Sequence, residues 1–349
     1  MGPVANAHLD WRKLREQKKK KKREDVEKYL LAMRKPENGE AIAENEEVVR
    51  PKTKNRLSIA VAGSILDNAQ TQELQTYLVG QIARAATIFK VDEVIVYDDT
   101  GSTMQEEGES SQTWYNCGVF AQILQYLECP QYLRKHFFPM TEELRYAGLL
   151  NPLDAPHHLR LNQESFYREG VVLQETDKSG KHSYANIGLH SKVKLDRLLQ
   201  PGLRVTVKLP TKSEETSKCT GIAVPPTQPK DDLGLYWGYE VRLAKSLGKV
   251  FTDCKHKKGY NLVIGTSDKG CPLDEVEFKK KKKIRALIVF GGLKGLEFAL
   301  EQDKSLEVDD VKLLFDHYVN TCPNQGSRTI RTEEALLISL AVITDKMKF

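Results

Sequence analysis

The apolar residues of the chain follow two different periods. Residues 57–62 and 91–97 are short apolar runs, which are typical of buried strands. Between them, apolar residues recur at helical spacing, which predicts a helix that is capped by Asp67 and Asn68 and ends near Ile88. Strand, helix and strand in this order predict a parallel α/β unit with a right-handed crossover.

A different pattern begins after Pro152. Residues 160–226 hold short runs of β-forming residues that are separated by turns, and no long amphipathic helix lies among them. This predicts a small antiparallel barrel or sheet of the OB size class. The α/β pattern resumes at Leu235 and closes with a helix from Thr332 to Val342.

We therefore expect one α/β domain that is split by a β insertion. The predicted parts are an N-terminal extension that is partly helical or disordered, the first half of the α/β domain, the OB-like insertion and the second half, at residues 1–52, 53–158, 159–228 and 229–349.

Charge is unevenly distributed along the 349 residues, whose formal net charge is +5. Residues 18–23 are an unbroken basic run, which a solvated tail or a localisation signal would also explain. A second run directly precedes the apolar residues 284–290 and so lies within a folded region. Basic runs attract polyanions through counterion release. The candidate RNA-binding residues are this second run and two basic residues of the insertion, Lys279, Lys280, Lys281, Lys282, Lys283, Arg204 and Lys208.

Composition argues against three classes of protein. No stretch approaches the ~20 uninterrupted apolar residues of a membrane helix. No apolar segment follows the basic N-terminal start, so a secretory signal is not expected. The six cysteines include no CxxC pair, which argues against a metal site and favours a reducing cytosolic or nuclear compartment.

Three glycine-marked segments follow apolar runs near the C-terminus, at residues 264–270, 290–297 and 320–335. In open α/β sheets, ligands lie beyond the carboxyl ends of strands, where glycine lets the backbone approach them closely. Any one of these segments alone would be an ordinary turn. The second lacks the spacing of a phosphate-binding loop, so a nucleoside triphosphate is not expected.

Taken together and in this order, the three segments resemble the cofactor loops of SPOUT methyltransferases. Arg56–Ser64, Leu235–Glu240 and Val319–Glu334 are similar to the eukaryotic and archaeal branch of these RNA methyltransferases, and the resemblance runs from about Arg56 to Val342. It implies a trefoil-knotted α/β domain that forms a homodimer, with S-adenosyl-L-methionine as cofactor and S-adenosyl-L-homocysteine as product.

The same resemblance implies a function. Members of this branch are associated with N3-methylation of uridine in large-subunit rRNA, and animal members with the mitotic spindle and kinetochore. We therefore expect localisation to the nucleus, nucleolus and cytoplasm, and to the spindle and kinetochore in mitosis. An RNA-binding or scaffold protein that keeps the fold and the pocket, and an enzyme of this fold acting on another base, are the alternatives.

The resemblance also nominates site residues. The N3 of uridine carries a proton, so a cation that stabilises the developing uridinate, or a general base, would assist transfer. Arg328 and Arg331 are candidates for this cation or for a phosphate clamp, and Arg56 is a third candidate that a surface ion pair would explain equally well. The cofactor-binding candidates are Ile264, Gly265, Thr266, Phe290, Gly291, Gly292, Leu293, Asn320, Thr321, Cys322, Pro323, Gln325, Gly326, Ser327, Thr329 and Ile330.

Other residues with chemical potential have a simpler explanation. Glu333 and Glu334 are better explained as helix caps than as catalytic groups. A packed thiol is the better hypothesis for Cys322 than a nucleophile. His157 and His158 lack a third metal ligand and suggest a hinge into the insertion. The aromatic residues of the 235–240 segment are expected in the core or in a dimer interface rather than stacked on a base.

Overall fold

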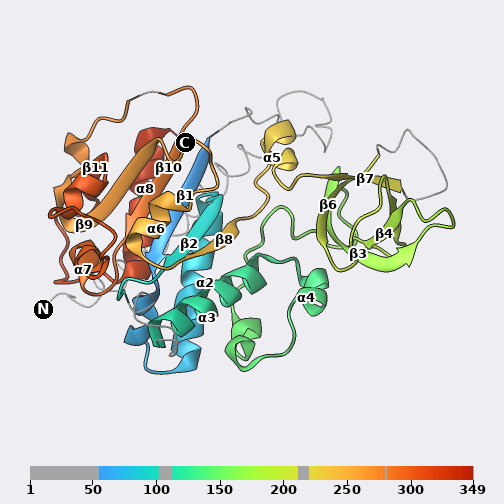
Figure 1. Cartoon of the computed structure of the whole chain (residues 1–349), viewed down its shortest axis with the longest axis horizontal. Coiled ribbons are helices and arrows are strands. Elements are labelled where there is room, and N and C mark those ends of the chain that lie inside the picture. Colours follow the sequence, from blue (N-terminus) through green and yellow to red (C-terminus); the bar gives the residue numbers. More distant parts are fainter. Residues whose placement is uncertain (1–54, 102–111, 211–219, 280, 349) are drawn as a thin grey trace, which may run out of the picture. The chain divides into compact units, whose positions relative to one another are not determined.

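A computed structural model describes residues 55–101, 112–210, 220–279 and 281–348 (Figure 1). The predicted N-terminal extension and Lys280 lie outside these residues. No described helix is long and apolar enough to cross a membrane. Among the same residues, no group of three or more His, Cys, Asp or Glu side chains is placed to hold a metal ion.

The α/β domain is built on a six-stranded sheet in the order β11-β9-β10-β1-β2-β8. Every neighbouring pair in this sheet is parallel, so the carboxyl ends of the strands meet at one edge and the amino ends at the other. The parallel unit predicted from the first apolar runs is confirmed. The strands are β1 Arg56–Ala62, β2 Glu93–Tyr97, β8 Glu240–Ala244, β9 Leu262–Pro272, β10 Arg285–Phe290 and β11 His317–Asn320.

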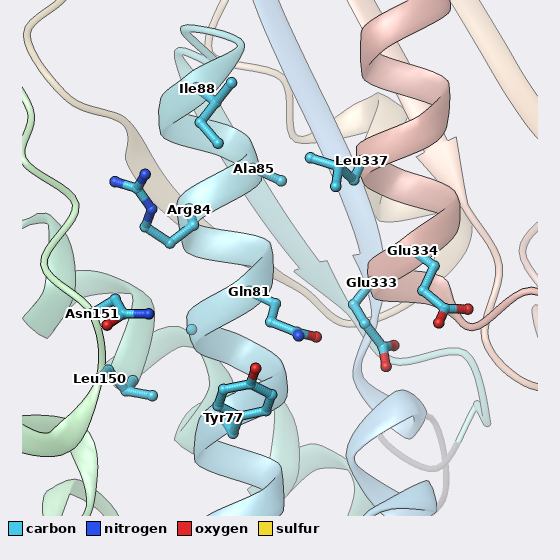
Figure 2. A pocket seen from close by; sticks show the side chains of 11 residues that line it. Tyr77, Gln81, Arg84, Ala85, Ile88, Leu150, Asn151, Glu333, Glu334 and Leu337 are labelled. Carbon is cyan, nitrogen blue, oxygen red and sulfur yellow. The ribbon is translucent and has the colours of Figure 1, made fainter. Parts of the chain in front are cut away.

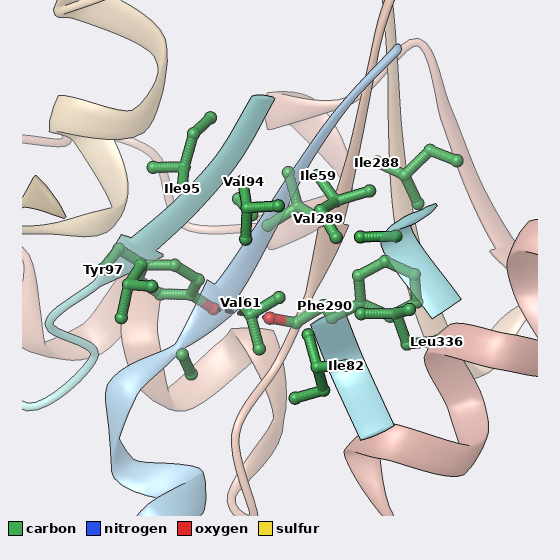
Figure 3. Packing of buried hydrophobic residues seen from close by; sticks show 14 of the residues in the cluster. Ile59, Val61, Ile82, Val94, Ile95, Tyr97, Ile288, Val289, Phe290 and Leu336 are labelled. Atoms are coloured by element: carbon green, nitrogen blue, oxygen red, sulfur yellow. Dashed lines mark hydrogen bonds between the residues drawn. The ribbon is translucent and has the colours of Figure 1, made fainter. Parts of the chain in front are cut away.

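Helices flank this sheet and supply much of the core. The side chains of Ile59, Val61 and Val289 are fully buried in a cluster that includes residues of two helices (Figure 3). Burying each such side chain contributes about 1.5–3 kcal/mol. The Tyr97 hydroxyl donates to the Phe290 carbonyl at 2.9 Å. The helices are α2 Gln72–Ile88, α3 Gln112–Glu128, α4 Gln131–Phe137, α5 Gln228–Leu233, α6 Leu247–Thr252, α7 Gly295–Gln302 and α8 Thr332–Met347.

The predicted cap of α2 is wrong. Residues 63–68 form a 3-10 turn, and the helix begins later with Thr71 as its N-cap. The Thr71 hydroxyl accepts from the Leu74 amide at 3.4 Å. Asp67 instead accepts a hydrogen bond from the Asn116 side chain at 2.6 Å, which links the 3-10 turn to α3.

The insertion is a closed five-stranded barrel in the order β3-β4-β5-β7-β6. It has its own apolar cluster, separate from the core of the sheet, which includes Val172, Ile187 and Val207. The β insertion predicted from residues 160–226 is confirmed. The strands are β3 Tyr167–Thr176, β4 Ser183–Asn186, β5 Val193–Leu195, β6 Arg204–Lys208 and β7 Thr220–Val224.

A buried charge network joins α3 to the barrel. The Arg204 guanidinium donates to both carboxylate oxygens of Glu128, at 2.6 and 3.0 Å, and to Glu169 at 2.7 Å. The two carboxylate side chains are 9% and 3% exposed. Arg204 was predicted to bind RNA; three of the five N–H groups of a guanidinium are taken here by the two acids, so Arg204 has a structural role and its binding of RNA stays a prediction.

The segments that enter and leave the barrel bind the same two acids. His157 Nε2 lies 2.9 Å from the Glu128 carbonyl oxygen and 3.0 Å from its carboxylate. Trp237 Nε1 donates to Glu169 at 2.6 Å. Burial alone would raise the pKa of Glu128, but the charge of Arg204 and the His157 hydrogen bond outweigh burial and hold it at about 2. Residues 157–158, the predicted hinge, are held by Glu128 at the joint between α3 and the barrel, and a hinge motion stays a prediction.

The aromatic residues of the 235–240 segment lie in the core, as expected. The Tyr236 hydroxyl donates to the Val91 carbonyl and the Tyr239 hydroxyl to the Leu124 carbonyl, both at 2.9 Å. All three rings, including Trp237, are at most 7% exposed. They are not available to stack on a base.

Acid should loosen the joint through His158. Its Nε2 lies 2.7 Å from the Glu128 carbonyl oxygen, and burial, with the neighbouring His157, lowers the pKa of His158 to about 4. In the unfolded chain, His158 has its ordinary pKa of about 6.5. Between pH 6.5 and pH 4 the unfolded chain therefore binds more protons than the folded chain. Unfolding free energy should therefore fall by about 3 kcal/mol as pH drops from 6.5 to 4.

Urea unfolding at pH 7 and pH 4.5 measures this loss. His158→Gln keeps a donor for the Glu128 carbonyl but does not titrate, so its stability should fall less over the same interval. An equal fall in the variant and in the wild type would assign the acid sensitivity to other groups.

Candidate functional site

The second glycine segment passes close to the ends of two strands. β10 ends at Phe290 and α7 begins at Gly295, whose φ is +82°. A Cβ on Gly292 would lie 2.5 Å from Ser64 Oγ and 2.6 Å from Asp99 Oδ2, and one on Gly291 would lie 2.8 Å from the Leu296 amide nitrogen. The backbone here therefore has no room for side chains, as the glycines predicted.

Asp99 is a buried carboxylate beside this loop. It follows β2 and accepts from the Ser64 hydroxyl at 2.5 Å and from the Ser64 amide at 3.2 Å. Burial raises the pKa of Asp99 although both hydrogen bonds act against that shift. Sequence analysis did not select Asp99. The available signal was an acidic pair, Asp98 and Asp99, directly after a buried strand.

The first glycine segment is not a loop, which corrects the prediction. Residues 264–270 belong to β9. Tyr318 of β11 is opposite Gly265 of β9, whereas the next residue, Val319, is opposite Cys271. The intervening residues form a bulge. Thr266 is opposite Phe290, the last residue of β10, so the bulge lies at the carboxyl edge of the sheet.

The glycines of this strand serve packing. A Cβ on Gly265 would lie 2.6 Å from the Phe315 ring, and one on Gly270 would lie 2.3 Å from the backbone of Val319. Ile264 is fully buried, and the Thr266 hydroxyl donates to the Val289 carbonyl at 3.1 Å. Of the predicted cofactor contacts in this strand, Gly265 and Ile264 are thus enclosed by protein.

Hydrogen bonds tie the three segments together at this edge. Glu297, in the first turn of α7, accepts from Lys269 of the bulge at 3.1 Å and from the Tyr318 hydroxyl of β11 at 3.3 Å. Asn320 donates to the Asp268 carbonyl at 2.9 Å, and Thr332 donates to the Gly291 carbonyl at 3.3 Å. Sequence analysis missed Glu297, because an acid in the first turn of a helix is ordinarily a dipole partner.

The third segment connects β11 to α8. Cys322 is partly buried, and its amide donates to the Asn320 side chain at 2.9 Å. The Thr321 hydroxyl lies 2.8 Å from the Ser339 hydroxyl of α8. The remaining candidates of this loop comprise the partly buried Gln325 and Ile330 and the exposed Pro323, Gly326, Ser327 and Thr329.

The two candidate arginines of this loop, Arg328 and Arg331, have exposed side chains. The Arg331 amide donates to the Glu334 carboxylate at 3.0 Å, which confirms Glu334 as a helix cap. Leu293 of the second loop is also exposed, at 74%. Arg328, Arg331 and Leu293 are therefore exposed to solvent beside the tied backbone segments.

Arg56 and the second basic run lie elsewhere. Arg56 opens β1 and donates to Asp231 at 2.9 Å, with Asp92 at 3.9 Å. Within one chain it is at the amino edge of the sheet, a strand length away from the three segments, and the ion-pair interpretation holds. The described residues of the second run, Lys279 and Lys281 to Lys283, precede β10 and are at the same amino edge. Lys208, on the barrel, has a 43% exposed side chain 3.9 Å from Asp232.

Comparisons with known proteins identify the family of the chain. A family model described as "Putative RNA methyltransferase" matches residues 56–343. A Drosophila melanogaster protein named 28S rRNA (uridine-N(3))-methyltransferase is 49% identical over 363 residues, which cover 99% of this chain and 75% of the fly protein. The Homo sapiens protein of the same name is 51% identical over 312 residues, which cover 88% of this chain and 82% of the human protein.

Among solved structures, the SpoU methyltransferase AviRb from Streptomyces viridochromogenes, in complex with AdoMet, is 11% identical with a TM-score of 0.32. The match covers 88% of this chain and 63% of the AviRb chain. A TM-score of that size is too low to establish a shared fold. The family model, in contrast, spans the α/β domain and the barrel from β1 into α8, so the chain belongs to this family of RNA methyltransferases.

Proposed function

We propose that the protein transfers the methyl group of S-adenosyl-L-methionine to N3 of a uridine in large-subunit rRNA. The observation that carries this proposal is the pair of animal relatives named for that reaction, which are about half identical over most of the chain. The three segments tied together at the carboxyl edge of the sheet support it, because ligands of open α/β sheets lie there.

The residues of this edge fit the proposed cofactor. Gly291 and Gly292 are partly exposed, and the contacts that exclude a Cβ there fix the position of a backbone whose polar groups would bind a flat polar ligand such as adenine. Residues 320–330 would hold the methionine end. Bound there, the cofactor supplies a methyl group on a positively charged sulfur, and S-adenosyl-L-homocysteine is the product.

The side chains of the protein would position the uridine and stabilise the charge that develops on it. Arg328 and Arg331 would hold a phosphate of the RNA or stabilise the negative charge that develops as the uridine N3 loses its proton. Alignment of the base with the methyl group supplies much of the rate acceleration. Asp99 and Glu297 would fix the loops through Ser64, Lys269 and Tyr318 rather than react.

The homodimer and the trefoil knot are also part of the proposal. Tyr77 of α2 and Leu337 of α8 are 56% and 46% exposed, and they line a cavity of about 250 Å³ between the two helices with Ile88 and Glu333 (Figure 2). Such apolar residues suit contact with a second copy. Sedimentation velocity tests this, and a monomer at micromolar concentration would contradict it. The spindle and kinetochore localisation and the OB-like class of the barrel stay predictions.

Methyl transfer to a defined RNA tests the function. The protein is incubated with isotope-labelled S-adenosyl-L-methionine and transcripts that tile the large-subunit rRNA, and the digested nucleosides are identified by mass spectrometry. We expect labelled 3-methyluridine from one transcript. Label on another base or on a ribose would overturn the N3 assignment. Cofactor binding without labelling of any tiled transcript would overturn the rRNA assignment.

A further inference from the structure

Two basic segments that are separated in the sequence lie together at the amino edge of the sheet. Residues 254–261 lead into β9, and the described residues 279 and 281–284 precede β10. Asn261 joins them: its side chain donates to the Lys283 carbonyl at 2.9 Å and accepts from the Arg285 amide at 2.8 Å. Arg285 Nε donates to the Gly259 carbonyl at 2.8 Å, and the Lys281 ammonium donates to the Asn261 carbonyl. The two segments are therefore held together by the side chains of Asn261, Arg285 and Lys281.

The joined segments concentrate positive charge on one surface. Their exposed lysines, which we term the basic platform, are Lys255, Lys257, Lys258, Lys279, Lys281, Lys282 and Lys283. Among the described residues, the only one of the seven in an ion pair is Lys255, which contacts Glu240. Burial lowers the pKa of His256, and the charges of Arg285, Lys283 and Arg56 lower it further against the pull of Glu93. Arg285 and Lys283 of the second segment therefore lie close enough to act on His256 of the first.

The basic platform is separate from the proposed cofactor site. Arg285 begins β10 and Phe290 ends it, and the candidate loops follow Phe290. Six residues of strand span roughly 17–20 Å at ~3.3 Å per residue. An RNA that reaches both edges must therefore cover at least that distance, which is about five to six nucleotides at the ~3.4 Å spacing of stacked bases.

We propose that the basic platform binds the phosphate backbone of the RNA substrate at a site remote from the nucleotide that is methylated. This inference rests on the proposed function for the identity of the RNA. Lysine is a flexible point charge without bidentate geometry, so the surface suits a polyanion whose sequence is not read. We favour RNA over an acidic protein because the chain belongs to an RNA methyltransferase family.

The test compares two triple variants that lose the same charge. The first carries Lys257→Gln, Lys258→Gln and Lys282→Gln, and the control carries Lys135→Gln, Lys304→Gln and Lys312→Gln, which are exposed lysines outside the basic platform. Binding of a fluorescein-labelled 24-nucleotide hairpin is measured by anisotropy between 50 and 300 mM KCl, and so is binding of a 3-nucleotide oligouridylate, which is too short to span the two edges. The platform variant should lose about 2 to 3 from the slope of log affinity against log salt for the hairpin.

The control variant should keep the wild-type slope, and neither variant should change binding of the short oligonucleotide. Equal slopes for the two triple variants would overturn the proposal. An equal loss on the 3-nucleotide probe would place the basic platform at the target site and overturn its remoteness. An unchanged hairpin slope with lost binding of polyglutamate would identify an acidic protein as the partner instead. Since no step requires methyl transfer, these outcomes are independent of whether 3-methyluridine is formed.

Discussion

Replacing Gly292 by arginine should abolish binding of S-adenosyl-L-methionine while the protein remains folded. Even a Cβ at this position would lie 2.5 Å from Ser64 Oγ and 2.6 Å from Asp99 Oδ2, so the loop must shift before any longer side chain is accommodated. The displaced backbone would no longer present its polar groups to the cofactor. We expect affinity to fall by at least about 100-fold, which corresponds to about 2.7 kcal/mol.

Calorimetric titration with S-adenosyl-L-methionine and S-adenosyl-L-homocysteine measures this loss, and circular dichroism reports the fold. Gly148→Arg is the matched control, because a Cβ there meets nothing within 4 Å and Gly148 lies outside the three candidate segments. Wild-type affinity in Gly292→Arg would show that the cofactor does not use this loop. Absence of binding in the folded wild type would favour the alternative that the protein is an RNA-binding or scaffold protein rather than an enzyme.

The joint between α3 and the barrel should be the most sensitive site for stability. Arg204→Met leaves the carboxylates of Glu128 and Glu169 without their shared cation, and removing one partner of a buried pair typically costs about 3–5 kcal/mol. Because the Arg204 side chain is 31% exposed, solvent screening favours the lower end, about 3 kcal/mol. Urea unfolding measures the difference.

Lys208→Met is the matched control for this prediction. Lys208 lies on the same strand, its side chain is 43% exposed and its nearest acid is 3.9 Å away, so its loss should cost less than about 1 kcal/mol. If the two variants were equally stable, the network would not hold the barrel. Weaker RNA binding by Arg204→Met at unchanged stability would support the original prediction from the sequence.

Local patterns predicted the parts of the fold that depend on near neighbours. The apolar runs at β1 and β2 and the helical spacing of α2 need only residues 57–97, and the alternation in the barrel strands pairs residues that are close in the chain. The bulge in β9 could not be predicted this way. The bulge exists because β11 pairs with β9 on both sides of residues 266–270. The register of these two strands cannot be read from local patterns in a single sequence.

The same distinction holds for the candidate site: features of single residues could be predicted, and contacts between distant residues could not. The glycines of the second loop marked a close approach correctly, since only the absence of a side chain was at issue. Asp99 and Glu297 were missed because each binds a partner from another element, Ser64 and Lys269 respectively. The structural role of Arg204 was missed for the same reason, because its two acidic partners come from α3 and β3. A basic residue on a basic module is indistinguishable in sequence from one that neutralises buried acids.

The position of β1 in the sheet has a consequence for how the protein is made. β1 pairs with β2 on one side and with β10 on the other, where Arg56 is opposite Arg285. During translation, one edge of this apolar strand must stay unpaired until the last quarter of the chain emerges from the ribosome. Unpaired apolar edges promote aggregation. We expect synthesis to depend on chaperones over that interval, whereas the barrel strands find their partners within the insertion itself.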